Sequence, residues 1–252
     1  MSEQKREKAV VIKQEEIATD IYSMWIKASF ADKAKPGQFI SVYTNDAGKL
    51  LPRPISICEI AEGMLRIVYR VAGAGTAEFS EYKAGDSITI LGPLGNGFPL
   101  EEKKAFLIGG GIGVPPMLEL AKQLNCEKQI VVGYRDELFL NEELEKQGSL
   151  YIATEDGSTG TKGNVMDAIR EHGLTADVIY ACGPKPMLRA IKAYAEEYHI
   201  TAWISMEERM ACGVGACLGC VCQTKDVDEH SQVHNKRICK DGPVFDAKEV
   251  EL

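Results

Sequence analysis

The chain has 252 residues, of which 45% are hydrophobic and 26% charged, with a formal net charge of -8. This length suits two ordinary domains or one large one, and the composition is that of a globular protein with a real core. The acidic balance, with no long basic run and no basic residues interleaved with aromatics, argues against a nucleic-acid partner.

The first eight residues are charged and lack the apolar segment of an export signal. No stretch approaches the roughly 20 apolar residues that cross a bilayer. We therefore expect a cytoplasmic protein with no membrane partner. Five of its eight cysteines lie between Cys212 and Cys239, and clustered cysteines in a reducing compartment more often hold metal than form disulfides.

Residues 1–100 are predicted to form a β domain, either a barrel or a sandwich, because short β-rich runs alternate with turn signals. The predicted strands are Ala9–Ile12, Ile21–Phe30, Phe39–Val42, Ile55–Ile60, Leu65–Val71 and Ile88–Leu91.

Two motifs in this region together indicate a phosphate-binding site. Arg53-Pro54-Ile55-Ser56 opens a strand, and Gly73-Ala74-Gly75-Thr76 leads into a short helix predicted over Ala77–Tyr82. Unpaired N–H groups at a helix start attract phosphate, and Gly75 lets the backbone approach it closely. An arginine before a proline is often only a surface residue, but its position about twenty residues before G-x-G-T favours a functional role for Arg53.

Residues 101–205 are predicted to form an α/β domain with a parallel sheet, because strands and helices alternate from Lys103 onward. The expected elements are Ala105–Ile108, Pro115–Leu124, Ile130–Tyr134, Glu137–Lys146, Leu150–Ala153, Val165–Glu171, Val178–Ala181, Pro186–Tyr198 and Thr201–Ser205, the last closing the sheet.

One turn of this domain indicates a dinucleotide site, although a glycine-rich turn alone can be merely a tight strand–helix connection. The glycine-rich stretch that holds Gly110, Gly111 and Gly113 joins a strand to a helix start, which suits a pyrophosphate. Cys182 and Gly183 follow a later strand. The loops that begin at Tyr134-Arg135 and at Glu155 also follow strands, although charged loop residues are often merely solvated.

Residues 206–252 form a tail rich in cysteine and glycine that is too short to bury its own core, so we expect a metal centre to hold it. Cys212, Cys217 and Cys220 give C-x4-C-x2-C, and Cys239 follows at a distance, which is the spacing of plant-type [2Fe–2S] ligation. A four-thiolate zinc site is the alternative, but such sites favour two C-x2-C pairs. A redox-active C-x-C from Cys220 and Cys222 is a third possibility.

Cys222 and Cys239 are both available as the fourth ligand. Along a strand Cys222 would lie only about 6.6 Å beyond Cys220 on the same face, so distance alone leaves it open. Cys239 is favoured because it closes the loop that starts at Cys220, and the Asp241-Gly242-Pro243 turn would then reverse the chain toward the cluster.

The order of these motifs resembles the ferredoxin–NADP reductase superfamily, and the resemblance spans nearly the whole chain. It implies an antiparallel β-barrel FAD-binding domain over residues 1–100, followed by an α/β NAD-binding domain in which the Cys182-Gly183 turn lies beside the nicotinamide. The strings from Met210 to Cys220 and from Cys239 to Phe245 look like those of the electron-transfer subunits of type B dihydroorotate dehydrogenases. A similar chain is the small subunit of NADH-dependent ferredoxin–NADP oxidoreductases, which typically has aspartate where Cys212 stands. A zinc-stabilised nucleotide-binding module without redox activity is the alternative from another class.

The resemblance implies FAD, a [2Fe–2S] cluster and NAD(H) as cofactors, with electrons passing to NAD⁺. It implies an FMN-containing dihydroorotate dehydrogenase catalytic subunit as partner, in a heterotetramer of two copies of each chain, and it places no catalytic residue in this chain. The residues expected to bind FAD and NAD(H) are Arg53, Pro54, Ile55, Ser56, Val68, Tyr69, Arg70, Gly75, Thr76, Gly110, Gly111, Gly113, Cys182 and Gly183.

Overall fold

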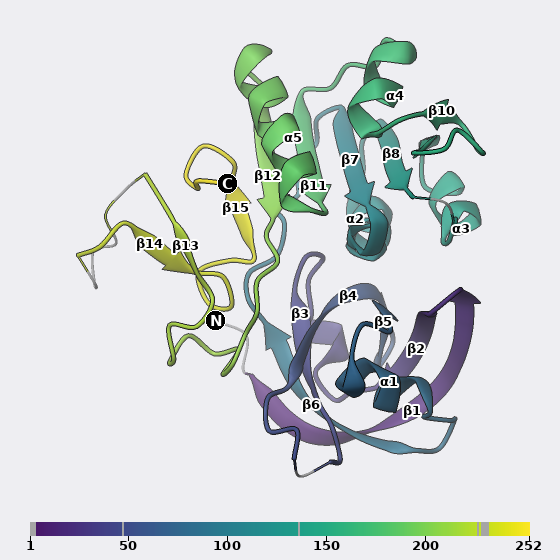
Figure 1. Cartoon of the computed structure of the whole chain (residues 1–252), viewed down its shortest axis with the longest axis vertical. Coiled ribbons are helices and arrows are strands. Elements are labelled where there is room, and N and C mark those ends of the chain that lie inside the picture. The colour runs from purple at the N-terminus through teal and green to yellow at the C-terminus, as the bar shows by residue number, and fades with distance from the viewer. Residues whose placement is uncertain (1–3, 47, 136, 226, 228–231) are drawn as a thin grey trace.

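The computed structural model describes residues 4–46, 48–135, 137–225, 227 and 232–252. Its first part is the predicted closed antiparallel barrel, in the order β1-β2-β5-β4-β3-β6 (Figure 1). The strands are β1 (Lys5–Ala18), β2 (Ile21–Lys27), β3 (Phe39–Tyr43), β4 (Arg53–Ala61), β5 (Met64–Arg70) and β6 (Ser87–Leu94). The short elements of this part are the 3-10 turn η1 (Ala31–Lys33) and helix α1 (Ala74–Ser80).

The barrel interior is filled by the inward-facing residues of each strand. Met24, Ile40, Leu65 and Ile90 are fully buried there. In β1 the alternation of buried and exposed residues is less regular. The strand begins at Lys5 and is much longer than the apolar run Ala9–Ile12 that predicted it. The extension pairs Lys5 to Val10 with β6, so backbone hydrogen bonding rather than apolar patterning sets its length.

The second part is the predicted parallel sheet, in the order β10-β9-β8-β7-β11-β12, with an additional strand at its edge. Its parallel strands are β7 (Ala105–Gly110), β8 (Lys128–Tyr134), β9 (Ser149–Thr154), β10 (Thr161–Lys162), β11 (Val178–Cys182) and β12 (Thr201–Ser205). The connecting elements are η2 (Gly111–Gly113), α2 (Pro115–Gln123), α3 (Asn141–Glu145), α4 (Val165–Glu171) and α5 (Lys185–Glu197). Among the described helices, none is long and apolar enough to span a membrane.

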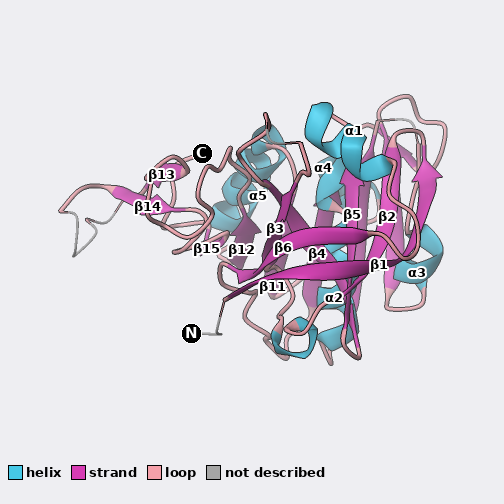
Figure 2. Ribbon diagram, turned by 90° about the horizontal axis from the view of Figure 1, so that it is seen from below, coloured by secondary structure: helices cyan, strands magenta, loops and turns pink. Residues whose placement is uncertain are grey.

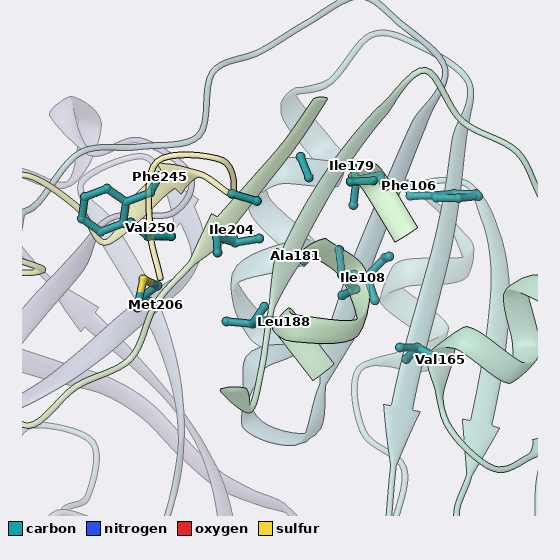
Figure 3. Close-up of a cluster of buried hydrophobic side chains, with 14 of the residues drawn as sticks. Phe106, Ile108, Val165, Ile179, Ala181, Leu188, Ile204, Met206, Phe245 and Val250 are labelled. Atoms are coloured by element: carbon teal, nitrogen blue, oxygen red, sulfur yellow. The ribbon is translucent and has the colours of Figure 1, made fainter. Parts of the chain in front are cut away.

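The tail is anchored differently from our expectation. Strand β15 (Val244–Asp246) pairs antiparallel with β12, so β12 does not close the sheet. Ile238, Phe245 and Val250 are buried in the same hydrophobic cluster as the sheet and α5 (Figure 3). The expectation that something other than hydrophobic burial must hold the tail is therefore wrong, because side chains of the tail pack into the hydrophobic core of the sheet.

The rest of the tail extends away from the sheet. The hairpin of β13 (Val221–Gln223) and β14 (Asn235–Arg237) lies at one end of the molecule, beyond β15 (Figure 2). The predicted boundaries between domains, at residues 100 and 205, stay a prediction.

Barrel and sheet share one apolar layer and several polar contacts. Ile21, Val68 and Phe98 of the first part pack in the same cluster as α2 and β8. Arg66 on β5 is buried and donates to Glu59 on β4 at 3.2 Å and to Glu143 on α3 at 2.9 Å. These contacts hold the two parts together on one side of the cleft between them.

Candidate functional site

A cleft of about 620 Å³ lies between the barrel and the carboxyl ends of the parallel strands. Ligands bind at this edge of open α/β sheets. Of the fourteen residues expected to bind FAD and NAD(H), all except Arg53 and Gly75 line this cleft. The structure thus brings both predicted motif groups to one place, and their roles as binding residues stay a prediction.

On the barrel side, Arg53 and Gly75 lie against each other. A β-carbon at position 75 would lie 2.1 Å from Nε of Arg53. Arg53 also donates to the carbonyl of Leu51 and lines a smaller adjoining pocket of about 400 Å³. The guanidinium therefore lies at the start of α1, where it supplies a positive charge next to the turn.

Thr76 shapes the turn that precedes α1. Its hydroxyl accepts hydrogen bonds from the backbone N–H groups of Ala72 at 2.9 Å and Gly73 at 3.2 Å. Helix α1 begins at Ala74, three residues earlier than predicted. Hydrogen bonds within the turn therefore fix its conformation, and Ala72 and Thr76 line the cleft.

On the sheet side, the two predicted turns pack directly on each other. A β-carbon at Gly113 would lie 2.3 Å from the carbonyl oxygen of Cys182, and one at Gly183 would lie 2.5 Å from Cε of Met187. Only glycine permits this approach. Burial raises the pKa of the Cys182 thiol to about 12, so the group at this end of the cleft is neutral at pH 7.

Sequence reasoning missed several cleft residues. Arg135 and Glu155, which the sequence left undecided, line the cleft. The residues that we did not single out include Phe39, Asn164, Met187, Ser205, Met206, Glu207, Glu208, Met210 and Pro243. Asn164 could have been found as the N-cap of a helix that follows a strand, and Glu207 and Glu208 by their position after the last parallel strand.

The cysteine loop directs backbone N–H groups at sulfur atoms. Cys212 Sγ accepts from the N–H of Ala216 at 3.3 Å, and Cys239 Sγ accepts from the N–H of Gly215 at 3.1 Å. Gly213 and Gly215 have φ of 69° and 84°, which favours glycine. Such N–H groups stabilise thiolates and cluster sulfides, so the residues present fit an iron–sulfur centre.

The four predicted ligands lie in two pairs. Burial opposes ionisation of Cys212, but hydrogen bonds from the Val214 N–H and from Cys217 outweigh it and lower its pKa to about 6. Cys239 pairs with Cys220, and burial together with that neighbour raises the Cys239 pKa to about 12. Within the described ranges, no three His, Cys, Asp or Glu side chains form a site for a single metal ion.

Cys222 lies apart from these pairs. It is buried on β13, and its thiol donates to the carbonyl of Lys236 on β14 at 3.5 Å. Burial raises the pKa of this thiol. It therefore behaves as a packed side chain of the hairpin.

Two family models match the chain. The iron–sulfur cluster binding domain of dihydroorotate dehydrogenase B matches residues 207–251, and the oxidoreductase NAD-binding domain matches residues 107–193. These matches cover the cysteine-rich tail and most of the parallel sheet.

Relatives match along almost the whole chain. The electron transfer subunit of dihydroorotate dehydrogenase B (NAD(+)) from Geobacillus sp. strain WCH70 is 44% identical over 262 aligned positions, covering 98% of this chain and 99% of the relative. The corresponding subunit from Fusobacterium nucleatum is 43% identical over 266 positions, with the same coverage.

Solved structures share the fold. A structure of an NADH-dependent reduced ferredoxin–NADP oxidoreductase matches with a TM-score of 0.87 and 30% identity, covering 97% of this chain and 90% of that one. A flavohemoglobin from Malassezia yamatoensis matches with a TM-score of 0.67 and 22% identity, over 77% of this chain and 57% of that one. The second likeness concerns the fold alone.

Proposed function

The chain belongs to the family of electron transfer subunits of dihydroorotate dehydrogenase B, and we propose that it passes electrons from a catalytic subunit to NAD⁺ through a [2Fe–2S] cluster and FAD. The observation that carries this proposal is that one chain contains both a two-sided cleft and a loop region whose backbone N–H groups donate to the sulfur atoms of Cys212, Cys220 and Cys239. As an oxidoreductase subunit of pyrimidine biosynthesis, it needs no substrate base of its own.

The barrel side of the cleft suits FAD. Arg53 would provide a positive charge, and the first residues of α1 at Ala74 and Gly75 would provide backbone N–H groups, for a pyrophosphate. Ser56, Val68 and Tyr69 form the adjacent wall, where they would orient a planar ring. When bound, FAD exchanges electron pairs with a nicotinamide and single electrons with an iron–sulfur cluster.

The sheet side suits NAD(H). The turn through Gly110 and Gly111 presents backbone to the cleft, and Cys182 and Gly183 form the end nearest the barrel. The neutral Cys182 thiol places no charge beside the ring of a nicotinamide. These residues would hold and orient the dinucleotide.

Four thiolates in two pairs suit a [2Fe–2S] cluster, in which each iron takes two cysteines. We assign Cys212 and Cys217 to one iron and Cys220 and Cys239 to the other. A zinc site would instead need the four sulfur atoms around one point. The proposal therefore includes iron and not zinc.

The cluster loop also presents apolar side chains to solvent. Leu218 is 60% exposed, and Val214 and Val221 are exposed beside it. Apolar side chains grouped around a redox centre suit contact with another protein. We propose that this surface faces an FMN-containing dihydroorotate dehydrogenase subunit, in a heterotetramer of two copies of each chain.

The test is to purify the chain alone and with its catalytic partner. The isolated chain should contain one FAD and two irons and two sulfides, show flavin and cluster absorption, and oxidise NADH with an artificial acceptor. It should oxidise dihydroorotate only after the partner is added. A colourless chain with bound zinc, or turnover of dihydroorotate by the chain alone, would contradict the proposal.

A further inference from the structure

Arg237 connects the two loops that carry the cysteine pairs. It is the last residue of β14, and its Nη1 donates to the carbonyl of Gly215 at 3.3 Å. Gly215 belongs to the loop from Cys212 to Cys220, whereas Arg237 is two residues before Cys239. One side chain thus joins the two segments that together supply all four sulfur atoms.

Asp241 holds the Arg237 side chain in place. Its carboxylate accepts from Nε of Arg237 at 2.9 Å and from Nη2 at 3.2 Å, which is a two-point contact. The same carboxylate accepts from the backbone N–H of Arg237 at 2.8 Å, and the Asp241 N–H donates back to the Arg237 carbonyl at 2.7 Å. The side chains are only 20% and 23% exposed, so solvent weakens the pair little.

The carbonyl that Arg237 contacts belongs to a peptide group that donates to sulfur. The C=O of Gly215 and the N–H of Ala216 are parts of the same planar group and point in opposite directions. Arg237 holds the oxygen, and the N–H at the other edge donates to Cys212 Sγ at 3.3 Å. A cation on the carbonyl also polarises the peptide group, which strengthens the donated hydrogen bond.

The peptide group on the other side of Gly215 also donates to a sulfur atom. The N–H of Gly215 donates to Cys239 Sγ at 3.1 Å. Rotation of the Gly215 peptides would therefore weaken hydrogen bonds to one cysteine of each pair. The left-handed conformation of Gly215 lets both groups point inward, and a β-carbon there would lie 2.7 Å from Cδ of Lys240.

We infer that Arg237, held by Asp241, is a positioning residue that orients the Gly215–Ala216 peptide toward the cluster sulfurs and thereby raises the reduction potential of the cluster. The reduced cluster carries one more negative charge than the oxidised cluster. Hydrogen bonds to sulfur therefore stabilise the reduced form more. This inference rests on the proposed [2Fe–2S] cluster.

The experiment compares the complete chain, purified with its cofactors, with four variants: Arg237→Gln, Arg237→Lys, the double variant Arg237→Gln/Asp241→Asn, and Arg170→Gln. Arg170 is an exposed arginine paired with Asp167 on α4, so it repeats the charge change away from the tail. Iron and sulfide content, the paramagnetic spectrum and the midpoint potential are measured for each. Spectra in H₂O and D₂O detect the exchangeable proton that Ala216 donates.

Loss of the Arg237 contact should lower the equilibrium constant for reduction of the cluster by about tenfold. This corresponds to a midpoint potential that is about 59 mV lower for one electron. The double variant Arg237→Gln/Asp241→Asn keeps the local net charge but lacks the contact between Arg237 and the Gly215 carbonyl. Its midpoint potential should therefore stay below that of the parent, and the coupling of the Ala216 N–H proton to the cluster should change. Arg170→Gln should match the parent.

A potential and spectrum in Arg237→Gln identical to the parent would overturn the inference. A double variant that returns to the parent potential would also overturn it, because charge alone would then explain the shift. If Arg237→Gln fails to retain iron, the Arg237→Lys potential decides: a lowered value supports the inference and an unchanged value refutes it. A parent chain without iron and sulfide would instead refute the proposed cluster itself.

Discussion

The guanidinium of Arg53 lies so close to the α-carbon of Gly75 that a β-carbon at this position would be 2.1 Å from Nε. Two motifs about twenty residues apart in sequence are therefore one structural unit. Glycine is required at position 75 because a larger side chain would overlap with Arg53. The backbone of Gly75 is not left-handed, so its conformation does not explain the choice of glycine.

Gly75→Ala should therefore displace Arg53 and weaken FAD binding. Overpacking of this kind costs roughly 1–3 kcal/mol, equivalent to roughly tenfold to hundredfold weaker binding. The measurement is the FAD content after gel filtration, together with the dissociation constant from flavin fluorescence. Arg53→Ala should have a similar effect, since the same charge is lost.

Gly73→Ala is the matched control in the same turn. A β-carbon at position 73 would meet no atom within 4 Å, and its φ of 178° is extended backbone open to any residue. This variant should retain FAD like the parent chain. Equal loss of FAD in both glycine variants would mean that the turn, and not the Arg53 contact, controls binding.

Most of the parallel sheet could be predicted because its strands, except the two-residue β10 (Thr161–Lys162), contain local apolar runs. All six residues of β7 (Ala105–Gly110) are buried, and the glycines that follow mark the turn. The glycine-rich turn is likewise a local feature that predicts Gly110 at the cleft, whereas the position of Cys182 follows from the resemblance to the superfamily. In the 206–210 segment, the position of Glu207 and Glu208 after the last parallel strand indicates the cleft, whereas no local signal marks Met210, which also lines it.

The anchoring of the tail could not be predicted from its own residues. The three residues of β15 have no periodicity, and their burial depends on an edge of β12 that is distant in sequence. Arg66 is a similar case, since a lone arginine in a strand indicates a solvated surface. Its burial comes from Glu143, which α3 brings from the other part of the molecule.

Arg66→Ala should strongly destabilise the contact between barrel and sheet. Loss of hydrogen bonds to charged groups costs roughly 1.5–3 kcal/mol, because Glu143 would lose the cation that it contacts at 2.9 Å, whereas Glu59 would keep Lys122 at 2.6 Å. Thermal unfolding followed by flavin fluorescence should show a markedly lower Tm.

Arg170→Ala is the control variant. It removes an ion pair whose arginine is 70% exposed, and such pairs contribute roughly 0–1 kcal/mol. Similar Tm values for the two variants would contradict the structural role of Arg66.

The ionisation of Glu137 should make the contact between the barrel and the sheet dependent on pH. Its carboxylate accepts hydrogen bonds from the hydroxyl of Thr19 at 2.5 Å and from its backbone N–H at 2.7 Å, and these bonds lower its pKa below the ordinary 4.5. Because the folded-state pKa is the lower one, the stabilisation is complete above pH 4.5 and is lost as pH falls through the folded value.

The Tm of the parent should therefore exceed that of Glu137→Gln at pH 7, and the difference should shrink as pH falls below about 4.5. Exposed Glu142→Gln serves as control and should follow the parent at every pH. A constant difference between parent and Glu137→Gln across the acid range would assign the effect to packing and not to the ionised carboxylate.

The fourth ligand can be tested with two conservative substitutions of buried cysteines. Cys239 Sγ accepts the Gly215 N–H at 3.1 Å and lies beside Cys220, whereas the Cys222 thiol donates to Lys236 across the hairpin. Serine is similar in size to cysteine at both positions, so the two variants change the packing to a similar extent.

Cys239→Ser should lose the cluster absorption and change the paramagnetic signal, with iron content well below two per chain. Cys222→Ser should keep both, at a small cost in stability. The opposite pattern would make Cys222 the ligand, and loss in both variants would mean that the hairpin itself must be intact for the cluster to form.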